Sequence, residues 1–180
     1  MTSPAYSYIC AVSPATCTTV GVATCFASAS SGAELELSAG TLSSGDGINS
    51  WARLTLQNKH ASIACSADGG ACVLQGATGK RVVYIRDNGG TSTLSHLVVK
   101  DGANDGGGLY VSNSNVVLIL VAFIDNAASY GGAIYVDFSG SSSVTLHGCS
   151  FSGNTASSAN NGPDVYNRQE TVAIGGCPDG

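Results

Sequence analysis

Short segments in which apolar and polar residues alternate recur along this chain. In the clearest example, Val144 and Leu146 share one face of an extended segment, and Cys149 and Phe151 share one face of the next. Alternation with a period of two is typical of β-strands. The phase shifts by one residue between Leu146 and Cys149, with no loop between them. Such a shift predicts a corner, at which one strand ends and the next begins on a different wall.

These segments return at a regular spacing. Four tyrosines recur at nearly constant intervals, of which the last is the longest, at the ends of short strands: Tyr84, Tyr110, Tyr135 and Tyr166. A second series runs parallel to the first with closely similar intervals: Leu74, Val99, Phe123 and Phe151. Repeats of this length are typical of stacked supersecondary units. We therefore predict an all-β fold, a single-stranded right-handed parallel β-helix with three short strands in each coil of about 25 residues.

The repeat motifs resemble those of a known superfamily. The runs Val144-x-Leu146, Phe151-x-x-Asn154 and Gly131-Gly-Ala-Ile-Tyr135 are similar to motifs of the pectin-lyase-like right-handed β-helix superfamily. They are closest to the branch with Phe-x-x-Asn and Gly-Gly-Ala-Ile repeats, which is known from polymorphic outer-membrane proteins and related surface proteins. The resemblance covers roughly residues 33–175. It implies the fold and says little about activity, because these motifs are structural.

The two ends of the repeat are expected to differ from its middle. Open ends of a β-helix leave unpaired strands that invite aggregation, so terminal units commonly act as caps. We expect residues 1–32 to form an N-terminal cap in which Thr18–Ser30 contains a short helix, with Cys25 buried inside it. Residues 33–180 are expected to form the β-helix domain.

Composition narrows the classes of partner. Of the 180 residues, 43% are hydrophobic and only 11% are charged, against about 25% charged in typical domains. The net charge is −5, and only seven residues are Lys or Arg. This balance disfavours nucleic acid as a partner, because phosphates require a basic surface. No apolar run approaches the ~20 residues of a transmembrane helix, and no signal peptide is recognisable.

Seven cysteines favour an oxidising compartment, and therefore an extracellular or cell-surface location. Their positions suggest three disulfides: Cys10–Cys17, Cys65–Cys72 and Cys149–Cys177. Other pairings remain open, because connectivity cannot be deduced from sequence. A zinc site is disfavoured, since the chain has no Cys-x-x-Cys pair and its three histidines are scattered.

One group of charged residues is compatible with catalysis. The resemblance implies a chemistry in which carboxylates hold Ca²⁺, the metal stabilises a uronate substrate, and an Arg or Lys removes a proton. Here Arg86 and Lys100 are the candidate bases, and Asp101 and Asp125 are the candidate Ca²⁺ ligands in adjacent coils. The alternative, which we favour, is that both aspartates are corner residues that bind nearby backbone N–H groups. On that interpretation no cofactor is expected.

The tyrosine series is the second candidate site. Each tyrosine follows an apolar residue that is expected to face inward, so Tyr84, Tyr110, Tyr135 and Tyr166 are expected to face outward. An outward aromatic row could bind sugar rings or a partner surface. The alternative is a purely structural ladder.

The sequence thus describes a scaffold more clearly than an activity. We expect a non-catalytic extracytoplasmic protein that serves surface structure, adhesion or assembly. Its partner would be a polysaccharide, a protein surface or further copies of itself. The alternative is a small carbohydrate-active protein, either a Ca²⁺-assisted lyase- or epimerase-like enzyme or a sugar-binding module. The modest length of its loops argues against the enzyme.

Overall fold

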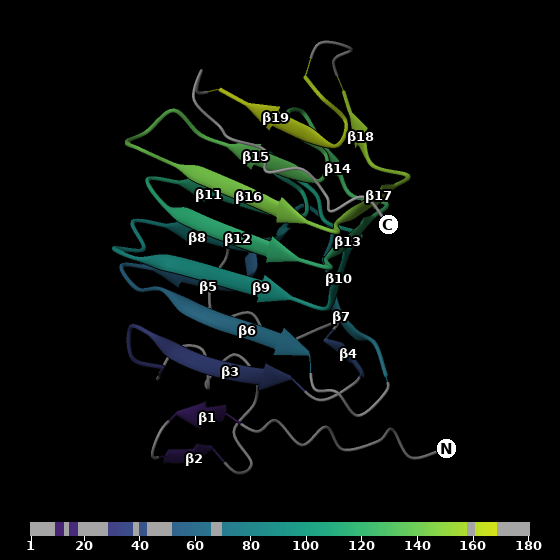
Figure 1. The fold of residues 1–180 in the computed structure, drawn as a ribbon. Coiled ribbons are helices and arrows are strands. Elements are labelled where there is room, and N and C mark those ends of the chain that lie inside the picture. The colour runs from purple at the N-terminus through teal and green to yellow at the C-terminus, as the bar shows by residue number, and fades with distance from the viewer. Residues whose placement is uncertain are drawn as a thin grey trace.

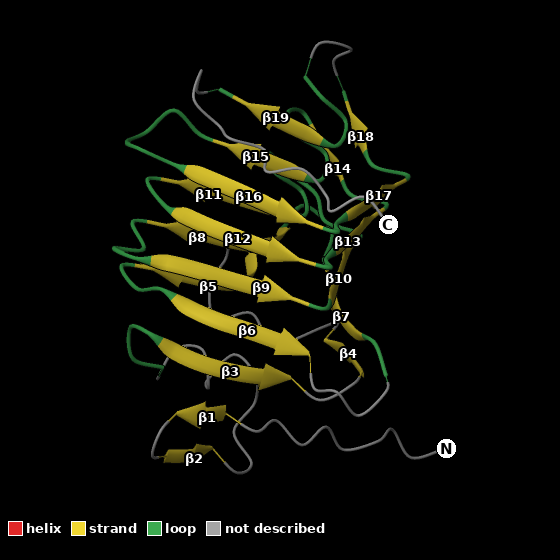
Figure 2. Ribbon diagram, in the orientation of Figure 1, coloured by secondary structure: helices red, strands yellow, loops and turns green. Residues whose placement is uncertain are grey.

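The protein is an all-β parallel solenoid of about four turns. The computed structural model describes residues 10–12, 15–17, 29–37, 40–42, 52–65, 70–157 and 161–168. All regular elements within these ranges are strands (Figures 1 and 2). The expected capping helix and Cys25 lie outside the described residues. Within them, no helix is long and apolar enough to cross a membrane.

Three parallel sheets of five strands form the walls of the solenoid. The front sheet, nearest the viewer in Figure 1, contains β3 (Ala33–Leu37), β6 (Ala61–Cys65), β9 (Thr91–Ser95), β12 (Asn115–Ile119) and β16 (Ser143–His147). The side sheet contains β4 (Gly40–Leu42), β7 (Cys72–Gln75), β10 (Leu97–Lys100), β13 (Ala122–Ile124) and β17 (Ser150–Ser152). The tyrosine sheet contains β5 (Ala52–Gln57), β8 (Arg81–Arg86), β11 (Leu109–Ser112), β15 (Ile134–Val136) and β19 (Val165–Asn167).

Two short pairs complete the described strands. The antiparallel pair β1 (Cys10–Val12) and β2 (Ala15–Cys17) lies below β3 in Figure 1. The parallel pair β14 (Ala127–Ala128) and β18 (Thr155–Ala156) follows the side sheet in the last coils.

The strand register confirms the predicted repeat. Tyr110 pairs with Tyr84 on one side and with Tyr135 on the other, and Tyr135 pairs with Tyr166. The second series pairs in the same way along the side sheet. The predicted coil length is too short, because a turn takes about 28 residues. The central coils are the shortest and the first coils are longer, and the additional residues fall between the strands.

Inward side chains from all three sheets form a single core. Leu74, Val99 and Phe123 are fully buried in the side sheet, as the period of two requires. The Phe123 and Phe151 rings stack with centroids 5.4 Å apart and planes inclined by 9°. Burial of each such side chain stabilises the fold by about 1.5–3 kcal/mol.

The core also contains a polar ladder made of Asn126 and Asn154. Asn126 Oδ1 accepts a hydrogen bond from the Gly102 backbone N–H, and Asn126 Nδ2 donates to the Val99 carbonyl. In the next coil, Asn154 Oδ1 accepts from both the backbone N–H and Nδ2 of Asn126. Both side chains are buried, so these bonds replace water at the corner.

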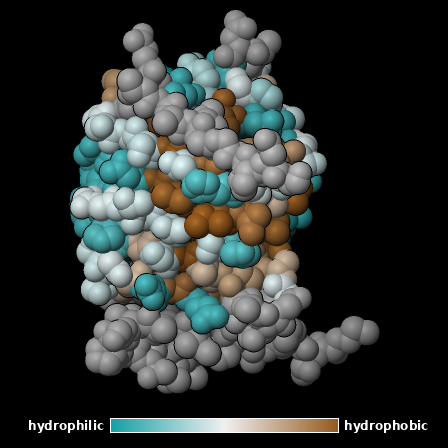
Figure 3. All heavy atoms as spheres, in the orientation of Figure 1, coloured by the Kyte–Doolittle hydropathy of each residue, from teal (hydrophilic) through white to brown (hydrophobic). Residues whose placement is uncertain are grey.

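The corner between the front and side sheets requires a left-handed residue. His96, Leu120 and Gly148 hold this position in successive coils, with φ of 57°, 52° and 60°. Leu120 is 53% exposed. Outward apolar side chains lie among polar ones on the face that carries the front sheet (Figure 3). Val117 and Ile119 of β12 contribute to them as half-buried residues.

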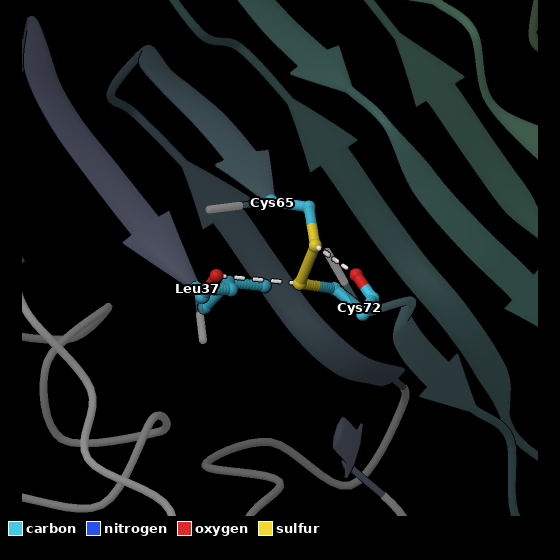
Figure 4. Close-up of a disulfide and its surroundings, with 4 residues drawn as sticks. Leu37, Cys65 and Cys72 are labelled. Carbon is cyan, nitrogen blue, oxygen red and sulfur yellow. Dashed lines mark hydrogen bonds between the residues drawn. A yellow bond between two sulfur atoms is a disulfide. The ribbon is translucent and has the colours of Figure 1, made fainter. Parts of the chain in front are cut away.

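A disulfide joins Cys65 and Cys72, with Cα atoms 5.6 Å apart. It connects the end of β6 in the front sheet to the start of β7 in the side sheet (Figure 4). The Cys72 sulfur lies 3.3 Å from the carbonyl oxygen of Leu37 in the preceding coil. The predicted Cys65–Cys72 pair is therefore present. Cys177 lies outside the described residues, so Cys149–Cys177 remains a prediction.

The pairing of Cys10 with Cys17 also remains a prediction. The backbone register of β1 and β2 places the two residues opposite each other. Their side chains lie outside the described part of the structure.

Candidate functional site

The structure separates the two candidate bases. Arg86 ends β8, at the corner between the tyrosine sheet and the front sheet. Lys100 ends β10, at the corner between the side sheet and the tyrosine sheet. Each is paired locally, Arg86 with Asp87 at 3.0 Å and Lys100 with Asp101 at 3.2 Å. The two cations therefore do not line one common groove.

The two candidate metal ligands occupy neighbouring coils but point in opposite directions. Asp101 and Asp125 hold equivalent corner positions with φ of 56° and 53°. Asp101 Oδ2 accepts a hydrogen bond of 2.8 Å from Gln75 Nε2 in the preceding coil. Asp125 Oδ1 lies over Gly153 in the following coil, where an added Cβ would meet it. Among the described residues, no group of three or more His, Cys, Asp and Glu could hold a metal ion.

The four tyrosines form a continuous column on the outer face of the tyrosine sheet. Successive ring centroids are 5.1, 5.3 and 5.7 Å apart, and the planes are inclined by 15–19°. Tyr84, Tyr110 and Tyr166 are half-buried, whereas Tyr135 is only 5% exposed. Because each ring covers the face of its neighbour, the column presents ring edges and hydroxyl groups rather than flat faces.

A second column of polar side chains runs beside the hydroxyl groups. The register places Ser112 opposite Arg86, and Asp137 and Arg168 continue the same row in the next two coils. Arg86, at the first position of this row, pairs with Asp87. Arg168 Nη1 donates to the Tyr135 hydroxyl at 3.3 Å.

Asp137 is the centre of this second column. It accepts hydrogen bonds from the Tyr110 hydroxyl at 2.7 Å, the Ser139 hydroxyl at 2.8 Å, the Phe138 backbone N–H at 2.9 Å and the Tyr135 hydroxyl at 3.4 Å. Burial alone would raise the pKa of Asp137, but these donors outweigh burial and lower it below its ordinary value. Burial, and then the bond to Asp137, raises the pKa of Tyr110.

Arginines gather on the same sheet. All four arginines of the chain lie in or directly after its strands: Arg53 in β5, Arg81 and Arg86 in β8, and Arg168 after β19. The Arg81 guanidinium lies 4.5 Å from the centroid of the Tyr110 ring, and its Nε donates to the Asp105 carbonyl. Arg168 lies 4.5 Å from the ring centroid of Phe138, which is 59% exposed. We call the outer face formed by the tyrosine column, the polar column and Arg81 the tyrosine–arginine face.

Three residues of this face were not predicted from the sequence: Asp137, Arg81 and Arg168. The tyrosines repeat a residue type at a constant spacing, whereas the polar column holds Arg, Ser, Asp and Arg in turn. The polar column could have been recognised in the sequence only by position. Each of its members follows the tyrosine of its coil by two residues and therefore lies on the same outward face.

Comparisons with protein-family models, with curated proteins and with solved structures give no match for this chain.

Proposed function

We propose that this protein is a non-catalytic extracytoplasmic scaffold that serves adhesion or assembly through the outer face of its solenoid. The observation that carries the proposal is the contrast between two sets of residues. The candidate catalytic groups are spread over two corners and bind their own neighbours. The tyrosines, Arg81 and Arg168, in contrast, are gathered on one sheet face and held in fixed positions.

Two further features support the proposal. The disulfide between Cys65 and Cys72 is compatible with an oxidising compartment. We also infer that the solenoid is right-handed and related to the pectin-lyase-like surface proteins, because its motifs resemble theirs and parallel crossover connections are almost always right-handed.

An enzymatic assay separates this proposal from the carbohydrate-active alternative. The protein is incubated with uronate polymers, with and without Ca²⁺, and the unsaturated product of a lyase is followed by ultraviolet absorbance. No product is expected under either condition, because the candidate base Lys100 is paired with Asp101 and lies at a different corner of the coil from Arg86. Turnover that requires Ca²⁺ and is abolished in Lys100→Ala would overturn the proposal.

Light scattering and surface adsorption test the scaffold function directly. We expect either a molar mass that rises with concentration above the 17.9 kDa monomer or retention on a polymer-coated surface. A protein that stays monomeric at every concentration and adsorbs to no surface would contradict a role in adhesion or assembly.

A further inference from the structure

The charge of this molecule is distributed unevenly. The net charge is −5, yet every arginine lies in or directly after a strand of the tyrosine sheet. Lys80 immediately precedes β8, so five of the seven basic residues lie in or next to this sheet. By the same count three carboxylates border these strands, those of Asp87, Asp137 and Asp164. The five basic groups outnumber them, so this sheet is the basic part of an acidic protein, and a basic surface attracts anions.

Two guanidinium groups on this face make no direct ion pair with a described residue, although the pKa of Arg168 is raised first by its hydrogen bond to Tyr135 and also by the Asp137 carboxylate in the neighbouring coil. Among the described residues, the two ion pairs involve Arg86 and Lys100, and neither includes Arg81 or Arg168. Arg81 is held by the Tyr110 ring and the Asp105 carbonyl, and Arg168 by the Phe138 ring and the Tyr135 hydroxyl. Aromatic rings and neutral oxygens orient a guanidinium without neutralising its charge. Both side chains are thus prepared to pair with an external anion.

The two guanidinium groups lie in different coils on opposite sides of the tyrosine column. Arg81 begins β8 and reaches the ring of Tyr110, whereas Arg168 follows β19 and reaches the hydroxyl of Tyr135. A single small anion can meet only one of them. A partner that meets both has to carry several negative groups on an extended chain.

The surroundings of the arginines favour a glycan over a peptide. Peptides commonly bind by adding a strand to a sheet edge or by filling an apolar groove. The three central strands of this sheet, β8, β11 and β15, are paired on both sides, and only β5 and β19 are edge strands. The exposed groups of the face are hydroxyls, ring edges and guanidinium groups. A sulfate ester offers three terminal oxygens, enough for one guanidinium and a hydroxyl together.

We propose that the tyrosine–arginine face binds a linear sulfated glycan, with Arg81 and Arg168 as its principal anion contacts. The inference rests on the proposed adhesion function and names its partner. Asp137, which stays ionised because of its four donors, repels negative groups at the centre of the face.

The test measures binding to immobilised dextran sulfate by biolayer interferometry, with unmodified dextran as the neutral reference. We expect binding to dextran sulfate that weakens as salt is raised, and none to dextran. Arg81→Gln and Arg168→Gln should each weaken binding about tenfold. Lys100→Gln removes the same charge from the side sheet and should change binding less than twofold. Circular dichroism establishes that each variant is folded, and the exposed Arg168 carries the prediction if Arg81→Gln does not fold.

Three outcomes would overturn the inference. Equal weakening by all three substitutions would show that net charge alone governs binding, and no weakening by Arg81→Gln or Arg168→Gln would place the contact elsewhere. Equal binding of polyglutamate would show that the face does not select a glycan. These results leave the scaffold proposal intact, since it is decided by the lyase and light-scattering measurements.

Discussion

The hydroxyl of Tyr110 donates a hydrogen bond of 2.7 Å to Asp137 Oδ2, although the two residues belong to different coils. The bond joins the tyrosine column to the polar column beside it. Because Asp137 also accepts from Ser139 and from the Phe138 backbone, it fixes the turn that follows β15. One carboxylate thereby connects neighbouring coils on the outside of the solenoid.

Replacement of Asp137 by Asn should destabilise the protein at neutral pH by about 1–3 kcal/mol, because the amide replaces one acceptor oxygen by a donor. The folded-state pKa of Asp137 is lowered. Its contribution to stability is therefore present above the unfolded pKa of about 3.9 and is lost as the pH falls through the folded value. Thermal unfolding measured from pH 2 to 7 should show a steeper acid decline for the wild type than for Asp137→Asn. Parallel declines would contradict this account of Asp137.

Tyr110→Phe should instead alter how the stability of the fold depends on pH on the alkaline side. The pKa of Tyr110 is raised by burial and by its bond to Asp137, so its contribution is complete below the unfolded pKa of about 10 and is lost as the pH rises above it. The Phe variant should lose about 1 kcal/mol at neutral pH and should lose less further stability than the wild type above pH ~10. Denaturant unfolding at pH 7 and 11 measures both quantities. An unchanged alkaline loss in the variant would assign that loss to other groups.

Asn126→Ala should be among the most destabilising polar substitutions. It leaves the Gly102 backbone N–H and the Val99 carbonyl without their present partner in a buried corner. Each unsatisfied buried group costs about 1–3 kcal/mol, so a total loss of about 2–5 kcal/mol is expected. Urea unfolding measures it.

Asn115→Ala is the matched control for this substitution. Asn115 is exposed, and its Oδ1 accepts from the Ser143 hydroxyl at 2.7 Å. Its replacement should cost less than about 1 kcal/mol. Similar losses of stability in the two variants would mean that the buried Asn126–Asn154 ladder stabilises the fold no more than an exposed hydrogen bond does.

Reduction of the Cys65–Cys72 disulfide should lower the free energy of unfolding by about 2–3 kcal/mol. The two cysteines are seven residues apart, and the loop-closure relation gives a value of this size for so short a loop. Urea unfolding of the Cys65→Ser/Cys72→Ser variant measures this loss. Because no reductant is added, any other disulfide stays intact in both the variant and the wild type. Peptide mapping of the unreduced wild type tests the predicted Cys10–Cys17 and Cys149–Cys177 pairs in parallel.

The coil architecture could be predicted from sequence because its signal is repetitive. The alternation of Val144 and Leu146, and the returning tyrosines, reflect a constraint that acts on every coil. The average coil length could not be fixed in the same way. The most regular steps lie in the central coils, where the loops are shortest, and the longer connections follow no repeat.

Which functional groups lie close together was harder to predict from the sequence than the coil architecture. Arg86 and Lys100 are close in sequence, but the chain between them passes along the front sheet and turns the corner after it. Conversely, Tyr110 and Asp137 are 27 residues apart and in contact. In a solenoid of this kind, the position of a residue along the chain indicates its place within a coil. Which residues are in contact depends on how the strands of neighbouring coils are paired.

The constant register, combined with variable loops, means that a whole coil can be removed or added without disturbing the pairing of the remaining strands. Val98 stands directly beside Ala122, so a recombination event that joins Val98 to Phe123 would remove one complete turn and leave every neighbouring strand with a parallel partner. The rod would shorten by the ~4.8 Å of one strand spacing, with its walls still continuous. The length of this protein can therefore change in discrete steps without a new core.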